Sequence, residues 1–171
     1  MLQYKYMKQF PPDFYFGTAT SSHQIEGNNT NNDWWRGEQD GKLPHKSGLA
    51  SDSYNRYEED FDLAKTMGNN AHRFSIEWSR IEPEEGKFSE EAIEHYRKVL
   101  SALRARGLEP FVTLHHFTNP IWFARMGGWT NKKAPEYFAK YVEYVASRLG
   151  EGVKYWITIN EPAIVISQGY L

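Results

Sequence analysis

The 171-residue sequence contains no cysteine. Disulfide bonds, thiolate metal sites and cysteine nucleophiles are therefore excluded, and this composition is typical of proteins from a reducing compartment. No apolar run reaches the roughly 20 residues that a membrane-spanning helix needs, and the Lys- and Tyr-containing N-terminus has no apolar signal-peptide core. We therefore expect a cytoplasmic protein with no membrane contact.

The sequence also lacks an excess of charge of either sign. Twenty Lys and Arg residues are interspersed with 22 Asp and Glu residues, for a net charge of -2. This distribution provides no basic surface for nucleic acid, so we predict no nucleic-acid partner. Neither of the glycine-rich phosphate-binding patterns, G-x-G-x-x-G and G-x-x-x-x-G-K-[ST], occurs, which argues against a nucleotide-binding fold.

Aromatic residues, in contrast, are abundant: 16% of the chain, with 6 Trp, 11 Tyr and 10 Phe. Most aromatic side chains pack in protein cores, and this is the default interpretation of each one. The total nevertheless suggests a site that stacks on sugar rings. The candidate platforms are Trp34, Trp35, Trp122 and Trp129.

Strand-like and helix-like segments alternate along the chain. The helices are predicted from apolar residues at helical spacing, as in the stripe Ile93, Tyr96, Leu100 and Leu103, which follows a capping Ser89. The strands are predicted from apolar, β-branched and aromatic runs. The predicted strands cover residues 13–20, 70–78, 109–117 and 153–160, and the predicted helices cover residues 53–68, 89–107 and 135–150.

This order predicts parallel strands joined by right-handed crossovers. A doubly wound sheet and a barrel both fit such an order, and the missing nucleotide motifs favour the barrel. Because a complete eight-unit barrel typically needs about 250 residues, four strands cannot close one. We therefore expect residues 1–171 to form one incomplete α/β domain, half of a (β/α)8 TIM barrel, completed by a partner chain or a missing C-terminal half.

Four stretches carry a family resemblance, and they occur where predicted strands end. "FPPDFYFGTATSSHQIEG", "NAHRFSIEWSRIEP", "VTLHHFTNPIWF" and "WITINEP" resemble, in this order, the N-terminal half of retaining β-glycosidases of the first glycoside hydrolase family, the β-glucosidase group. The resemblance runs from about Phe10 to the last residue. It implies a (β/α)8 barrel, in which reactive groups lie at the carboxyl ends of the strands.

The resemblance also implies roles for individual residues. Glu161 of N-E-P would be the general acid/base, and Asn160 would bind the sugar 2-hydroxyl. Gln24 and His116 would bind other ring hydroxyls, and Arg73 would orient the nucleophile. The nucleophile itself belongs to a T-E-N-G motif that this sequence does not contain. The resemblance implies no cofactor and no metal.

The local sequence around Glu161 and Arg73 also leads to an expectation for each residue, independent of the resemblance. Because Glu161 precedes Pro162, we expect an extended backbone and a carboxyl group at the barrel mouth, with burial and the absent nucleophile raising its pKa. The alternative is a solvated loop carboxylate. Arg73 lies within a predicted buried strand and is expected to have a carboxylate partner. The alternative to the orienting role is a structural ion pair with Glu77 or Glu161.

Two adjacent histidines, His115 and His116, do not predict a metal site, because neighbouring side chains on a strand point to opposite faces. We expect His115 to pack in the core and His116 to form hydrogen bonds at the strand end. Gln24 has the alternative of a loop-stabilising amide. Many family members have His-Trp where this chain has His116-Phe117, so an indole donor to the sugar is lost and the sugar preference stays open.

The resemblance implies retaining hydrolysis of terminal β-D-glycosidic bonds on a β-glucoside or related small sugar substrate, and we expect activity only with the missing C-terminal half. The alternative is a non-catalytic half-barrel module, natural or engineered, that self-associates or binds a complementary half. A weaker alternative is a sugar-binding protein without turnover that uses Gln24, His116 and Asn160.

Overall fold

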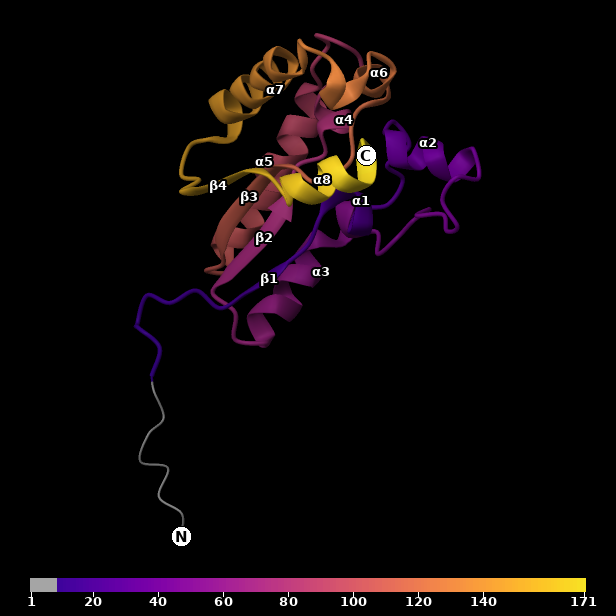
Figure 1. Cartoon of the computed structure of the whole chain (residues 1–171). Coiled ribbons are helices and arrows are strands. Elements are labelled where there is room, and N and C mark those ends of the chain that lie inside the picture. Colours follow the sequence, from indigo (N-terminus) through magenta and orange to yellow (C-terminus); the bar gives the residue numbers. More distant parts are fainter. Residues whose placement is uncertain (1–8) are drawn as a thin grey trace.

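A computed structural model describes residues 9–171 and contains one four-stranded sheet. The strands are β1 (Gly17–Ala19), β2 (Ala71–Ser75), β3 (Glu109–His115) and β4 (Tyr155–Ile159). They lie side by side in chain order, and each neighbouring pair is parallel (Figure 1). The predicted four parallel strands are confirmed.

Three long helices connect the strands and pack on one face of the sheet: α3 (Ser53–Thr66), α5 (Glu90–Ala105) and α7 (Ala134–Leu149) (Figure 1). The connections also contain shorter helices: α1 (Ser22–Ile25), α2 (Asp33–Gln39), α4 (Trp78–Ile81), α6 (Ile121–Arg125), the 3-10 helix η1 (Gly128–Thr130) and α8 (Pro162–Gly169). None of the helices in residues 9–171 is long and apolar enough to cross a membrane.

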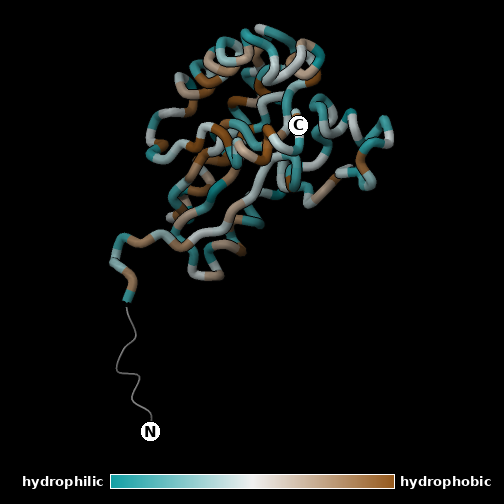
Figure 2. Tube along the Cα trace, viewed as in Figure 1, coloured by the Kyte–Doolittle hydropathy of each residue, from teal (hydrophilic) through white to brown (hydrophobic). Residues whose placement is uncertain are grey.

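The core lies between the sheet and the three long helices. The predicted stripe of α5 is fully buried, and the Ser89 hydroxyl accepts a hydrogen bond from the Ala92 N–H at 3.1 Å, as expected for an N-cap. From the sheet, Phe74, Val112 and Leu114 pack against the helices. Figure 2 shows the hydrophobic positions running along the strands and the helices beside them.

The opposite face of the sheet is open. The register aligns Arg73 with Phe111 and Phe111 with Tyr155, so these side chains share the face that the long helices do not cover. The rings of Phe111 and Tyr155 stack at 4.4 Å, and Tyr15 lies edge-on to both. Tyr15 and Tyr155 are exposed, which leaves an aromatic surface on this side.

The observed elements are shorter than several of the predicted ones. β1 covers three residues rather than 13–20, and β2 and β4 each cover five. At Gly17 the two backbones come close, because an added Cβ would lie 2.8 Å from the Ala71 carbonyl oxygen. The aromatic run before Gly17 is largely exposed, so high strand propensity there did not produce strand pairing.

Candidate active site

The residues expected to carry function follow the carboxyl ends of the four strands. Backbone hydrogen bonds continue the sheet there: the Thr20 N–H donates to the Arg73 carbonyl, and the Asn160 N–H donates to the His115 carbonyl, both at 2.9 Å. Because the strands are parallel, their carboxyl ends share one edge of the sheet. The loops that contain Gln24, His116 and Glu161 therefore start from the same edge.

His116 is half-buried at the end of β3, and burial and the nearby positive charge of Arg73 lower its pKa to about 4. The imidazole is therefore neutral at neutral pH and can both donate and accept a hydrogen bond. Its Nδ1 atom is buried and has no hydrogen-bond partner within residues 9–171. A buried unpaired ring nitrogen is suited to bind a ligand hydroxyl.

The structure excludes the alternative role of Arg73, a structural ion pair with Glu77 or Glu161. Among residues 9–171 it forms no ion pair, so neither Glu77 nor Glu161 is its partner, and its Nε atom is buried and unpaired. The strand is buried on the helix side, but Arg73 points to the open side and is only half-buried. Its guanidinium is thus available to a carboxylate from outside the described chain.

Asn160 and Glu161 follow β4 directly. Asn160 is 7% exposed, whereas Glu161 is exposed, so the expected burial of the Glu161 carboxyl group is not found in residues 9–171. The prediction of an extended backbone at Glu161 is wrong: φ is 45° and ψ is 60°, in the left-handed region, and the residue is the N-cap of α8. Pro162 disfavours the right-handed region for the residue before it, and the chain must turn sharply from strand to helix here. Backbone strain of this kind in a non-glycine residue is typical of functional sites.

Gln24 lies in α1, and its side chain is exposed. Its Oε1 accepts a hydrogen bond from the Ser21 hydroxyl at 2.5 Å, which leaves the amide NH2 free of any intramolecular bond in the described chain. The side chain therefore has a loop-stabilising contact and also two donors that face solvent. Its assignment to a sugar site stays a prediction.

A cleft of about 570 Å³ lies next to the segments that follow His116 and Glu161, but neither of these residues nor Gln24 lines it. Trp34 from α2 and Phe117 form part of its wall, with ring planes parallel within 1° and centroids 5.9 Å apart. Ile164 and Val165 of helix α8, and Tyr170 directly after it, also line the cleft. Trp34 is 41% exposed and is the candidate platform that faces the cleft.

The other candidate tryptophans have different surroundings. Trp122 and Trp129 pack against the core around the buried Trp78, although the buried Nε1 of Trp129 has no hydrogen-bond partner within residues 9–171. His115 is 1% exposed, and its Nε2 pairs with the Asn119 Oδ1 at 3.0 Å, which confirms the predicted core position. Within residues 9–171, no cluster of three His, Asp or Glu side chains is arranged to bind a metal.

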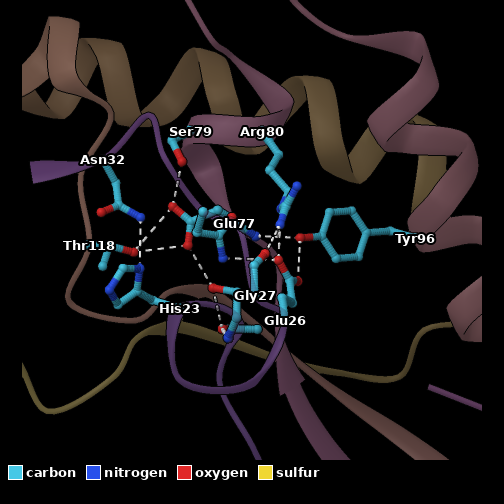
Figure 3. Close-up of polar contacts among 12 residues, drawn as sticks. His23, Glu26, Gly27, Asn32, Glu77, Ser79, Arg80, Tyr96 and Thr118 are labelled. Atoms are coloured by element: carbon cyan, nitrogen blue, oxygen red, sulfur yellow. Dashed lines mark hydrogen bonds and ion pairs between the residues drawn. The ribbon is translucent and has the colours of Figure 1, made fainter. Parts of the chain in front are cut away.

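Buried carboxylates near this edge already have protein partners. Glu26 binds the Arg80 Nε at 2.8 Å and accepts from the Tyr96 hydroxyl at 2.7 Å (Figure 3). Glu82 accepts from the Trp78 indole and from the Gly86 N–H, each at 2.8 Å. Burial raises the pKa of both carboxyl groups. Neither is free to act as a second catalytic carboxylate.

The similarity of this chain to known proteins covers these same residues. The family model described as "Glycosyl hydrolase family 1" matches residues 6–171. The chain belongs to glycosyl hydrolase family 1. A 1,4-beta-D-glucan glucohydrolase of Thermotoga neapolitana is 36% identical over 96% of this chain, and Beta-glucosidase 40 of Arabidopsis thaliana is 43% identical over 94%.

Solved structures of the family superimpose on this fold. A β-glycosidase from Pyrococcus horikoshii shares 52% identity over 95% of this chain with a TM-score of 0.90, and the Thermotoga maritima β-glucosidase in complex with cyclophellitol gives a TM-score of 0.93 at 35% identity. The chain spans only 41% and 34% of the two curated relatives and 38% of the Pyrococcus chain. The four parallel strands thus match the N-terminal part of a family 1 TIM barrel, as predicted.

Two structural features at this edge of the sheet were not predicted from the sequence. Helix α8 was not predicted, although Pro162 at its first position is a helix-start signal. The parallel stacking of Trp34 on Phe117 had no signal in the sequence, because helix α2 and the loop after β3 meet only in the folded protein.

Proposed function

We propose that the complete protein hydrolyses terminal β-D-glycosidic bonds with retention and that this chain supplies the acid/base. Glu161 would protonate the leaving oxygen while a carboxylate attacks the anomeric carbon, and would then activate water. Asn160, Gln24 and His116 would bind the sugar hydroxyls. The substrate is a β-glucoside or a related small sugar, in agreement with the names of the relatives.

One observation carries the proposal. The family motifs follow the carboxyl ends of four adjacent parallel strands, and buried atoms of Arg73 and His116 have no partner in the described chain. An unpaired buried polar atom is costly, typically about 1 to 3 kcal/mol, unless a ligand or another part of the protein binds it. For His116 the proposed partner is a sugar hydroxyl, and for Arg73 it is the nucleophilic carboxylate.

The nucleophile would come from a complementary C-terminal half-barrel, as a second chain or as a continuation of this one. Retaining hydrolysis requires two carboxyl groups about 5 to 5.5 Å apart, and the sequence has no T-E-N-G motif. The other half would also pair β1 and β4 and cover the aromatic surface formed by Tyr15, Phe111 and Tyr155. We propose a cytoplasmic location for the assembly, which fractionation of producing cells would test.

The test is an assay with an aryl β-glucoside of the purified 171-residue chain, alone and mixed with a polypeptide that carries the remaining four units, with sizing by light scattering. We expect no turnover by the chain alone and turnover by the mixture. The alternative, a self-associating non-catalytic module, would bring two Glu161 carboxyls together without a nucleophile and would stay inactive in both samples. Robust turnover by a monodisperse monomer of this chain would contradict the proposal.

A further inference from the structure

Glu77 is a buried carboxylate that the proposed chemistry does not use. It lies two residues after β2, is 1% exposed and forms no ion pair within residues 9–171. The nearby Arg80 binds Glu26 instead. Burial of a carboxylate without a cation is unfavourable unless its oxygens accept hydrogen bonds from the protein.

Three hydroxyl groups provide these hydrogen bonds, and each comes from a different segment. Ser79 donates at 2.7 Å from α4, and Ser22 donates at 2.8 Å from the start of α1. Thr118 donates from the loop after β3, at 3.0 and 3.2 Å to the two carboxylate oxygens. Figure 3 shows Glu77 between the Ser79 and Thr118 hydroxyls. One side chain therefore joins the carboxyl ends of the first three strands.

The Ser22 contact fixes the loop of Gln24. The Ser22 N–H donates to the Ser75 hydroxyl at 2.7 Å, and the Ser75 hydroxyl donates to the Ser22 hydroxyl at 3.1 Å. Together with the bond from the Ser22 hydroxyl to Glu77, these bonds attach the first turn of α1 to the end of β2. Gln24 follows two residues later in the same turn, so its position depends on this attachment.

The Thr118 contact fixes the loop of His116. Phe117 has a φ of 69°, which is unfavourable for a bulky side chain and persists only where its surroundings enforce it. The Thr118 N–H donates to the His116 carbonyl at 2.9 Å and closes a tight turn around Phe117. The hydroxyl of the same Thr118 donates to Glu77, so Glu77 holds the last residue of this strained turn in place.

We propose that Glu77 is a positioning residue, which sets the Gln24 and His116 loops relative to each other through the Ser22 and Thr118 hydroxyls. This inference rests on the proposed function for its kinetic consequence, because Gln24 and His116 are the proposed sugar ligands. Glu77 itself contacts no substrate. Glu77 affects turnover only by setting the positions of the two loops. This kinetic effect can therefore be measured separately from a general loss of stability.

The test compares two variants that each remove one hydroxyl from Glu77 in the assembled enzyme. Thr118→Val cuts the contact to the His116 loop, whereas Ser79→Ala removes a donor that belongs to neither sugar-binding loop. We expect Thr118→Val to lower kcat/KM for an aryl β-glucoside about tenfold, the size of one hydrogen bond to a charged group, and Ser79→Ala to change it less than about twofold. Both should lower Tm, since both leave an incompletely bonded carboxylate.

A double-mutant cycle separates positioning from a merely structural role. In a His116→Ala background, Thr118→Val should cost little further kcat/KM, because the residue it positions is gone. The same cycle applies to Ser22→Ala in a Gln24→Ala background. Equal kinetic losses for Thr118→Val and Ser79→Ala, or a full tenfold loss in the His116→Ala background, would overturn the inference.

A second measurement does not depend on turnover. Labelling only this chain with isotopically enriched histidine in the assembly gives the His116 imidazole resonances by NMR. Thr118→Val should shift them, and Ser79→Ala should leave them unchanged. Unshifted His116 resonances in Thr118→Val would overturn the inference, while an inactive wild-type assembly with the expected shifts would contradict the proposed function alone.

Discussion

Replacement of Arg80 by Met should destabilise the fold in a pH-dependent way. Arg80 binds the Glu26 carboxylate at 2.8 Å, donates to the Gly27 carbonyl at 2.7 Å and lies 4.0 Å from the centre of the Tyr54 ring. Met keeps much of the apolar stem but removes the charge and the donors. Glu26 would then be a buried carboxylate without a cation, since only 9% of its side chain is exposed.

The expected loss follows from these contacts. Breaking a buried ion pair from one side typically costs about 3 to 5 kcal/mol, and the Arg80 side chain is 21% exposed, which favours the lower end. We therefore expect the free energy of unfolding to fall by about 3 kcal/mol at pH 8. When Glu26 is protonated, Arg80→Met should still lower the free energy of unfolding by about 1 to 2 kcal/mol, because the contacts of Arg80 with Gly27 and Tyr54 are lost.

The pH dependence has a definite sign. Burial raises the pKa of Glu26 above its ordinary value of 4.5, while Arg80 lowers it. Since a raised carboxyl pKa favours the protonated folded state, the associated stability is present below the unfolded pKa and is lost as pH rises through the folded pKa. Removal of Arg80 raises the folded pKa further. The cost of Arg80→Met should therefore be smallest at low pH and grow as pH rises.

Urea unfolding of the assembled protein between pH 5 and pH 8, followed by tryptophan fluorescence, measures this difference. Glu26→Gln should reduce the cost of Arg80→Met at pH 8, because a neutral amide replaces the isolated carboxylate. Arg56→Met is the matched control, since its ion pair with Glu59 is exposed and should contribute little at any pH. A cost for Arg80→Met that is the same at pH 5 and pH 8, or one that Glu26→Gln does not reduce, would refute this reasoning.

Two further predictions concern the acid/base and the backbone. In the active assembly, Glu161→Gln should slow glycosides with poor leaving groups far more than activated aryl glycosides, because an activated group departs without a proton; equal losses in kcat on both substrates would count against the role of Glu161. Gly27→Ala should destabilise much more than Gly68→Ala, as both have positive φ, but the new Cβ at Gly27 would lie 2.1 Å from the Leu49 carbonyl oxygen whereas Gly68 has open space. The free energies of unfolding of the two variants provide the comparison, and similar values would contradict the predicted overlap.

The order of elements was predictable from the sequence because it depends on local signals. The apolar stripe of α5 and its Ser89 cap are properties of one short segment, and both were confirmed. The alternation of helices and strands then restricted the fold to parallel architectures, and residues 9–171 contain four parallel strands in sequential order. The motifs at the strand ends are also short, contiguous stretches, and their resemblance to the family predicted the family membership.

The hydrogen-bond and ion-pair partners of individual side chains were decided only by the tertiary structure. Arg73 was expected to have a carboxylate partner, and strand alternation directs it to the open face, where it forms no ion pair within residues 9–171. Glu77 meets Ser22 and Thr118 across 55 and 41 residues of sequence, respectively. No periodic pattern encodes such contacts, because they depend on which loops converge at the end of the sheet. The left-handed backbone of Glu161 has the same origin: the sequence specifies Pro162, but the need to turn sharply from β4 into α8 exists only in the folded sheet.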